Sequence, residues 1–133
     1  MQLIATRIFT DDVDGLLAFY EKVTGVTANR VHPLFGEIAT PTGTLAIAST
    51  ATIPLLGEGL LEPKANRSVA LDLLVDDVDA AQESLREIVG EFANEPTTMP
   101  WGNRSLLFRD PDGNLVNVFT PVTDAAKARF AAE

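Results

Sequence analysis

Few residues in this sequence can perform acid–base or metal chemistry. It contains a single histidine, His32, directly before Pro33, and it contains no cysteine. One histidine without a thiolate argues against a zinc-type site, and no serine or acid is spaced to complete a nucleophilic triad. His32 is expected to be exposed or packed in a loop, with a ligand or proton-shuttle role as the alternative. No phosphate-binding loop or glycine-rich dinucleotide motif is present.

Two acidic pairs, Asp11-Asp12 and Asp76-Asp77, are the other candidates. Their carboxylates could form an all-oxygen cation site. Each pair also comes just before an apolar run of helical period, where an aspartate caps the helix and interacts favourably with its dipole. We predict that these residues are helix caps.

The acidic pairs belong to an internal repeat. Asp11-Asp12-Val13-Asp14 recurs 65 residues later (11 to 76) as Asp76-Asp77-Val78-Asp79, and Pro41-Thr42-Gly43 recurs 70 residues later (41 to 111) as Pro111-Asp112-Gly113. A nearly constant offset indicates that one supersecondary unit has been duplicated. The two copies are expected to pack against each other and to leave a cavity between equivalent strands.

Hydrophobic periodicity and turn residues predict a strand, a helix and a three-strand meander in each half. In the first half the strands are expected at residues 3–10, 28–31, 36–39 and 44–49, with a helix that carries Val13 to Val23 and ends just before Gly25. In the second half they are expected at 68–75, 92–95, 105–109 and 115–120, with the helix at 78–89 and a short terminal helix at 124–130. Residues 51–66 read as a loop that connects the halves.

Composition fits one globular domain over residues 1–133. The chain is 46% hydrophobic and carries a net charge of −9. We expect a first module at 1–50, a connecting loop at 51–67, a second module at 68–121 and a C-terminal helix at 122–133. The acidic balance opposes nucleic-acid binding, and it suits either cationic ligands or solubility alone. No apolar run approaches the roughly 20 residues of a membrane span, so we expect a cytoplasmic protein that does not bind membranes.

Three segments resemble the vicinal oxygen chelate superfamily, which contains glyoxalase I, extradiol dioxygenases, fosfomycin-resistance enzymes and bleomycin-resistance proteins. They are Leu17-Ala18-Phe19-Tyr20 running to Gly25, Leu73-Leu74-Val75-Asp76-Asp77-Val78-Asp79-Ala80, and Phe108-Arg109-Asp110-Pro111-Asp112-Gly113-Asn114-Leu115-Val116. The resemblance implies an α+β fold in which two βαβββ modules form a curled mixed sheet around a cavity. It also implies a homodimer.

The resemblance also indicates where a metal would bind. Metal-using members take one ligand from the first strand and one from the last strand of each module. These positions fall on Ala5, Ala70 and Asn117, and an offset of 70 places the fourth on Ile47. Typical metal enzymes have His, Gln or Glu there, whereas alkyl groups cannot ligate and one amide oxygen is a weak ligand. We therefore expect no metal and no other cofactor.

Strand alternation from these positions predicts the residues that line the cavity. The expected ligand-binding residues are Arg7, Phe9, Ile47, Asp72, Trp101 and Asn117. Arg7 and Asp72 are repeat mates of opposite charge, so they either form a salt bridge that closes the module interface or anchor a ligand. Trp101 is either a core residue or an aromatic wall at the cavity mouth.

Three functions remain open from the sequence. The first is a metal-free binder of a small organic molecule, similar to the bleomycin-resistance proteins, which sequester a drug. The second is a lyase or dioxygenase, either metal-dependent with a displaced site or metal-independent through Arg7 and Asp72. The third is an interaction protein whose cavity is only core.

Overall fold

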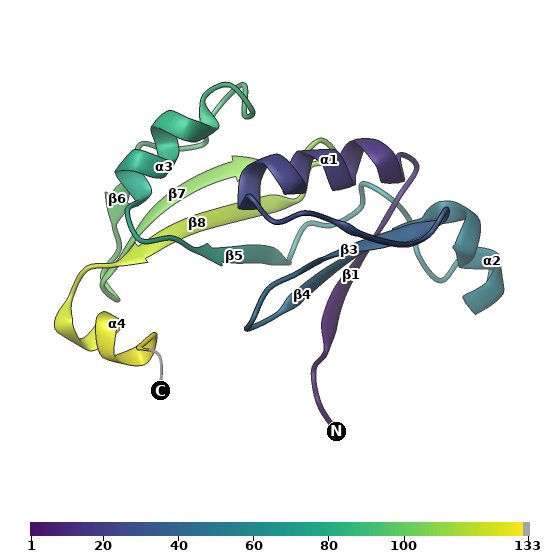
Figure 1. Cartoon of the computed structure of the whole chain (residues 1–133), viewed down its shortest axis with the longest axis horizontal. Helices are drawn as coiled ribbons and strands as arrows, with labels where there is room; N and C mark the ends of the chain where they lie inside the picture. The colour runs from purple at the N-terminus through teal and green to yellow at the C-terminus, as the bar shows by residue number, and fades with distance from the viewer. Residues whose placement is uncertain (132–133) are drawn as a thin grey trace. The chain divides into compact units, whose positions relative to one another are not determined.

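We analysed a computed structural model of the chain, which describes residues 1–131 (Figure 1). The chain divides into two compact units, Met1–Arg67 and Ser68–Glu133, called unit 1 and unit 2 below. Both units have α+β architecture, with helices and one four-stranded mixed sheet each. No helix in the described residues is long and apolar enough to cross a bilayer. That the two units make a single domain around a cavity stays a prediction.

Unit 1 contains one βαβββ module followed by two short helices. Its elements are β1 (Ala5–Thr10), α1 (Val13–Thr24), β2 (Asn29–His32), β3 (Phe35–Ala39), β4 (Thr44–Ser49), the 3-10 helix η1 (Thr50–Thr52) and α2 (Ile53–Leu56). The strand order is β1-β4-β3-β2, with β1 parallel to β4 and the other neighbours antiparallel. The sheet is open, with β1 and β2 as its two edge strands.

Unit 2 repeats this topology. Its elements are β5 (Ala70–Leu74), α3 (Val78–Leu85), β6 (Thr97–Thr98), β7 (Asn103–Arg109), β8 (Leu115–Pro121) and α4 (Asp124–Arg129). The strand order is β5-β8-β7-β6, and again only the first pair is parallel. Ala5 and Ala70 occupy matching positions, since each begins its strand and pairs with the first residue of the unit's last strand. The predicted duplication of a βαβββ module is therefore confirmed.

The second aspartate of each acidic pair caps a helix, as predicted, whereas Asp11 accepts a hydrogen bond from the Thr50 hydroxyl. The Asp12 carboxylate accepts a hydrogen bond from the Gly15 amide at 2.9 Å, and the Asp77 carboxylate accepts from the first turn of α3. Helix α1 ends at Gly25, whose φ of 71° is the left-handed conformation that glycine adopts without strain.

Each sheet has a helix face and a far face. In unit 1, a Cβ added to Gly36 would meet the side chain of Leu17 in α1, which shows that Gly36, Ile38 and the paired Ile47 face the helix. In unit 2, Arg104 bonds Asp79 of α3, so the even-numbered residues of β7 face that helix. Four of the residues on this side are at most 1% exposed and form its core: Leu106, Phe108, Val116 and Val118. The alternate residues define the far face.

The two equivalent hairpins differ by one residue. Four residues, 40–43, connect Ala39 to its partner Thr44, whereas five residues, 110–114, connect Arg109 to Leu115. In the longer turn, Asp110 accepts hydrogen bonds from the amides of Asp112 and Asn114, both at 2.9 Å. The offset between equivalent residues therefore rises from 70 before the turn to 71 after it (44 to 115). The predicted offset of 70 for the last strands is wrong.

Other elements also differ from the prediction, including the helix expected at 78–89, which ends at Leu85. The strand expected at 92–95 is reduced to a bridge from Phe92 to Phe108, and the outer strand β6 forms later, at Thr97–Thr98. The side chain of Asn94 takes the place of a strand there, because its Oδ1 accepts from the Leu107 amide and its Nδ2 donates to the Ser105 carbonyl. The expected loop at 51–66 contains α2, a single turn with a proline in its first positions.

Candidate functional site

The pairing register fixes the position equivalent to Asn117. Asn117 lies opposite Asp72 of β5, and Ala46 lies opposite Arg7 of β1. The repeat mate of Asn117 is therefore Ala46 and not Ile47. Ile47 is fully buried on the helix face, so its assignment as a ligand-binding residue is wrong. The extra residue in the 110–114 turn caused the error, because a one-residue slip moves a side chain to the other face.

With this register, the four positions that the family resemblance implies for metal ligands are Ala5, Ala46, Ala70 and Asn117. Three methyl groups offer no lone pair, and the single amide oxygen is a weak ligand by itself. Within residues 1–131, no three His, Asp or Glu side chains are grouped as a metal site requires. At the positions that the resemblance implies, these residues do not fit a divalent metal.

Asp72 and Asn117 form a hydrogen-bonded polar pair on the far face of unit 2. They lie on neighbouring parallel strands, and Asn117 Nδ2 donates a hydrogen bond of 3.0 Å to Asp72 Oδ1. A carboxylate only accepts hydrogen bonds, so this contact fixes the amide with its NH2 toward Asp72. Asn117 Oδ1 is buried and has no hydrogen-bond partner among the described residues. Besides the second hydrogen on Nδ2, the remaining hydrogen-bonding sites of the pair are therefore acceptors.

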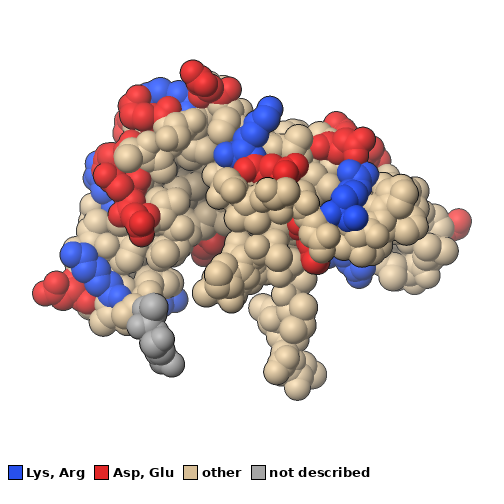
Figure 2. Space-filling model, in the orientation of Figure 1, with Lys and Arg blue, Asp and Glu red and all other residues tan. Residues whose placement is uncertain are grey.

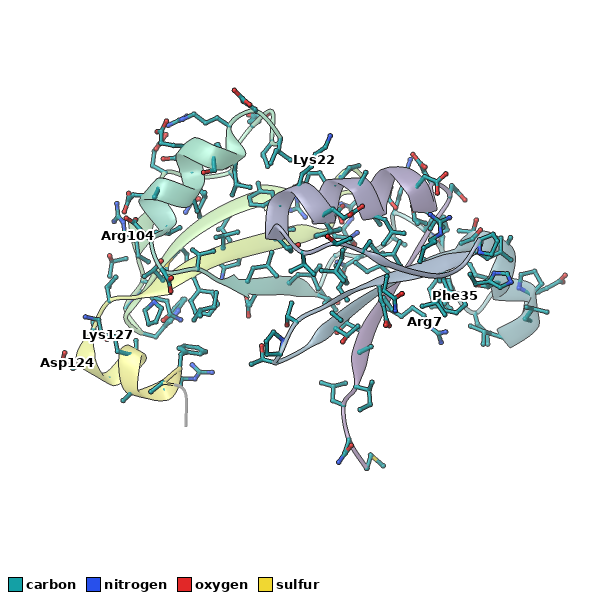
Figure 3. The ribbon with its side chains drawn as sticks, viewed as in Figure 1. Arg7, Lys22, Phe35, Arg104, Asp124 and Lys127 are labelled. Carbon is teal, nitrogen blue, oxygen red and sulfur yellow. The ribbon has the colours of Figure 1, made fainter. Side chains whose placement is uncertain are left out.

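Arg7 and Phe9 lie together on the far face of unit 1. The Arg7 guanidinium is 5.3 Å from the centre of the Phe9 ring, and it extends from β1 on the side away from α1 (Figure 3). Phe9 itself is only 8% exposed, because it is buried with Ala48 and Ile53. Its ring therefore supports Arg7, while the face that it could offer to a ligand is largely covered.

Glu37 is a far-face residue that was not predicted from the sequence. The register places it opposite Ala46, which in turn lies opposite Arg7, so one row across the sheet carries an acid, a methyl group and a base. Asn29 donates a hydrogen bond of 3.3 Å to the Glu37 carboxylate. The signal in the sequence was the odd–even alternation of 35–39, but the partner register of this strand was needed to use it.

Arg7 and Asp72 belong to different units, and each has a contact within its own unit. Arg7 lies over Phe9, and Asp72 accepts from Asn117. Both side chains are exposed. A salt bridge between them stays a prediction, as does a shared role in binding.

Trp101 is separated from the Asp72–Asn117 pair along the sheet. It lies in the loop before β7, which begins at Asn103, whereas Asn117 pairs with Leu107. Four residues of strand span about 13 Å, so Asn103 lies about that far along β7 from Leu107, and Trp101 precedes Asn103. The neighbouring Gly102 carbonyl accepts from the Val122 and Thr123 amides, which places Trp101 beside α4. Trp101 is 64% exposed, so it is not a core residue.

His32 is also on the surface. Its Nδ1 accepts a hydrogen bond of 3.0 Å from the Leu34 amide, and its ring stacks on Phe35 at 5.8 Å between centres. The side chain is exposed at the last residue of β2, which agrees with the expected exposed position. These contacts account for His32 without a ligand or proton-shuttle role.

The charged side chains on the surface are mostly acidic. Figure 2 shows acidic side chains over both units and basic ones in scattered groups on the face in view. The ion pair of Arg104 and Asp79 lowers the pKa of the Asp79 carboxyl, chiefly through the hydrogen bond from Arg104. It lies on the helix face, so it belongs to the packing of α3 and not to the far-face site.

The chain was compared with known proteins and structures. The Glyoxalase/Bleomycin resistance protein/Dioxygenase superfamily matches residues 2–118. The uncharacterized protein YraH of Bacillus subtilis (strain 168) is 27% identical over 125 residues, which cover 90% of this chain and 98% of YraH.

Solved structures agree on the fold. A glyoxalase/bleomycin resistance protein/dioxygenase from Nocardioides has a TM-score of 0.74 and 24% identity, covering 93% of this chain and 85% of its own. A glyoxalase/bleomycin resistance protein/dioxygenase family enzyme from Burkholderia phytofirmans PsJN has a TM-score of 0.79 and 18% identity. The match covers 92% of this chain and 100% of the Burkholderia chain. At these identities the likeness shows the fold alone. With the family match over most of its length and the duplicated βαβββ module, the chain belongs to the Glyoxalase/Bleomycin resistance protein/Dioxygenase superfamily.

Proposed function

We propose that this protein is a metal-free member of its superfamily that binds a small organic molecule and sequesters it without chemistry. The observation that carries the proposal is the residue set at the family's metal positions, Ala5, Ala46, Ala70 and Asn117. Three of these cannot ligate. The fourth has its amide hydrogen-bonded to Asp72, which suits an organic ligand better than an ion that needs several oxygen or nitrogen donors.

Polar groups surrounded by apolar side chains support the same proposal. Along β8, Asn117 lies between Leu115 and Phe119 on one face, and Leu107 lies opposite it on β7. A small-molecule site usually consists of a few polar groups surrounded by apolar side chains. We propose that Asp72 and Asn117 contact the ligand.

Metal analysis and ligand screening test the proposal. Protein purified without added metal should contain well under one equivalent of zinc, nickel, iron or manganese, and calorimetry should detect no tight binding of these ions. A thermal-shift screen with drugs, thiol conjugates and catechols should raise the melting temperature with at least one organic class. Stoichiometric metal that is lost in Asn117→Ala would instead support the alternative, a metal-dependent lyase or dioxygenase. A screen without any hit would leave only an interaction protein.

A further inference from the structure

We infer that the ligand recognised by unit 2 is an organic cation with N–H donors, such as a primary ammonium or amidinium group on an apolar body. This inference rests on the proposed function and deepens it by naming the ligand class. The recognition group consists of the Asp72 carboxylate and the Asn117 amide oxygen, neighbours across β5 and β8.

The first argument is the direction of the hydrogen bonds. Because Asn117 Nδ2 donates one of its two hydrogens to Asp72 Oδ1, the other two oxygens of the pair are Asp72 Oδ2 and Asn117 Oδ1, and both are acceptors. Asn117 Oδ1 is buried without a partner, and an unsatisfied buried acceptor is costly. The missing partner must be a donor. A carboxylate or phosphate ligand would place acceptor against acceptor and would be repelled.

The second argument is charge. No lysine or arginine in the described part of unit 2 forms an ion pair with Asp72, so its charge is available to a ligand. Asp72 is exposed at the edge strand β5, which leaves it accessible from solution. The net charge of −9 raises the local concentration of cations around the whole molecule. The accessible Asp72 carboxylate and the acidic surroundings favour a cationic ligand over a neutral hydrogen-bond donor.

The third argument separates an organic cation from a metal ion. Two oxygen donors are too few for calcium, which takes about six to eight, and no further acidic group completes a set among residues 1–131. Most of the surrounding far-face side chains are apolar or small: Ala70, Leu74, Ser105, Leu107, Leu115 and Phe119. Arg109 also lies on this face, opposite Leu115, and donates a hydrogen bond to the Gly113 carbonyl. Leu74 is 51% exposed and gains from being covered by an apolar ligand body.

A matched set of probes tests this inference. We would titrate isotopically labelled protein with 2-phenylethylammonium, N,N,N-trimethyl-2-phenylethylammonium, 2-phenylethanol and 3-phenylpropanoate, and follow amide shifts by NMR. The primary ammonium should bind most tightly and shift the Asn117 side-chain amide. The trimethylated probe keeps the charge but lacks N–H donors, so it should bind several-fold more weakly. The alcohol should bind more weakly again, and the carboxylate should not bind.

Variants locate the site. Asp72→Asn should raise the Kd for 2-phenylethylammonium about tenfold or more, because a hydrogen bond to a charged group is lost. Asn117→Leu should also raise it and should abolish the preference for the primary over the trimethylated probe. Glu87→Gln is the matched control. It removes the same charge from an exposed position in unit 2 and should leave the Kd unchanged.

The outcomes distinguish the inference from the proposed function. Equal binding of ammonium and alcohol, or an ammonium Kd that Asp72→Asn leaves unchanged, would overturn the inference while an organic binder remained. Failure of every organic compound in the wider thermal-shift screen would overturn the proposed function itself. The probe comparison uses the unmodified protein, so it decides the question even if Asn117→Leu does not fold.

Discussion

Arg104 and Asp79 provide a test of electrostatics at the scale of single residues. Two hydrogen bonds of 2.9 and 3.0 Å join the guanidinium to the carboxylate. Because the hydrogen bond from Arg104 lowers the pKa of Asp79, Arg104→Gln should raise that pKa toward its usual value. A carboxylate with a lowered folded pKa adds stability above its unfolded pKa and loses it as pH falls through the folded value. The natural protein should therefore have the higher urea midpoint at neutral pH. The midpoints of the two proteins should converge in acid.

Carbon-detected NMR titration of the Asp79 carboxyl measures this directly. Arg86→Gln is the control, since Arg86 pairs with Glu83 at 3.2 Å on the exposed side of unit 2 and should not move the pKa of Asp79. An unchanged Asp79 pKa in Arg104→Gln would show that the pair does not persist in solution.

Ile47 tests the assignment of faces. It has no exposed surface, so Ile47→Ala should lower the free energy of unfolding by about 2 to 5 kcal/mol. Leu55→Ala removes a comparable side chain that is 84% exposed and should change it by less than about 0.5 kcal/mol. Urea denaturation measures both. A small effect of Ile47→Ala would indicate that Ile47 lies on the far face and that an offset of 70 relates the last strands of the two halves.

Asp72 tests the relation between the two charged repeat mates. If its main partner is the Asn117 amide, Asp72→Ala should cost only about 1 kcal/mol of unfolding free energy, the typical value of one hydrogen bond. A buried salt bridge with Arg7 would instead cost about 3 to 5 kcal/mol, because an unpaired cation would remain. Denaturant titration of Asp72→Ala, with Arg7→Ala beside it, separates the two cases.

At this scale, sequence reasoning identified part of the site. Alternation from Ala70 and Asn117 brought Asp72 and Asn117 to one face, and the structure joins them by a hydrogen bond. Reasoning from the sequence missed Glu37, because the register of β3 against β4 depends on the turn between them and cannot be read from either strand. The same dependence misplaced Ile47.

Gly102 provides a test at the scale of elements. Its φ is 94°, and a Cβ there would collide with Thr123 Oγ1, the side chain that caps α4 by accepting from the Ala126 amide. Gly102→Ala should therefore destabilise the protein by about 1 to 3 kcal/mol and loosen α4. Gly43 has open space around its Cβ position and no positive φ, so Gly43→Ala should be neutral or slightly stabilising. Urea denaturation, with hydrogen exchange in α4, measures both effects. Unchanged exchange in Gly102→Ala would contradict the role of this contact.

Regular elements were predictable where local signals agreed. The strand expected at 44–49 is found over the same residues, and both predicted caps start their helices. The strand expected at 92–95 failed because Asn94 bonds the β7 backbone through its side chain, and Pro96 has no amide hydrogen to donate to a ladder. These are tertiary contacts that local propensity does not contain.

At the scale of the whole molecule, we predict a homodimer, which the family resemblance implies. Light scattering at micromolar concentration should give about twice the chain mass of 14.3 kDa. Sedimentation velocity over a range of concentrations provides the control for weak association. A monomer mass throughout would contradict the prediction.

The one-residue difference between the hairpins at 40–43 and 110–114 also affects how the duplicated halves can evolve. If recombination or gene conversion replaced the longer turn by the shorter one, β8 would shift by one residue against β7. Val116 and Val118 would then leave the core, and Asn117 would enter it. Such exchanges would be removed by selection. The extra residue thus acts as a barrier to homogenisation, so that the Asp72–Asn117 half and the Arg7–Ala46 half can specialise independently.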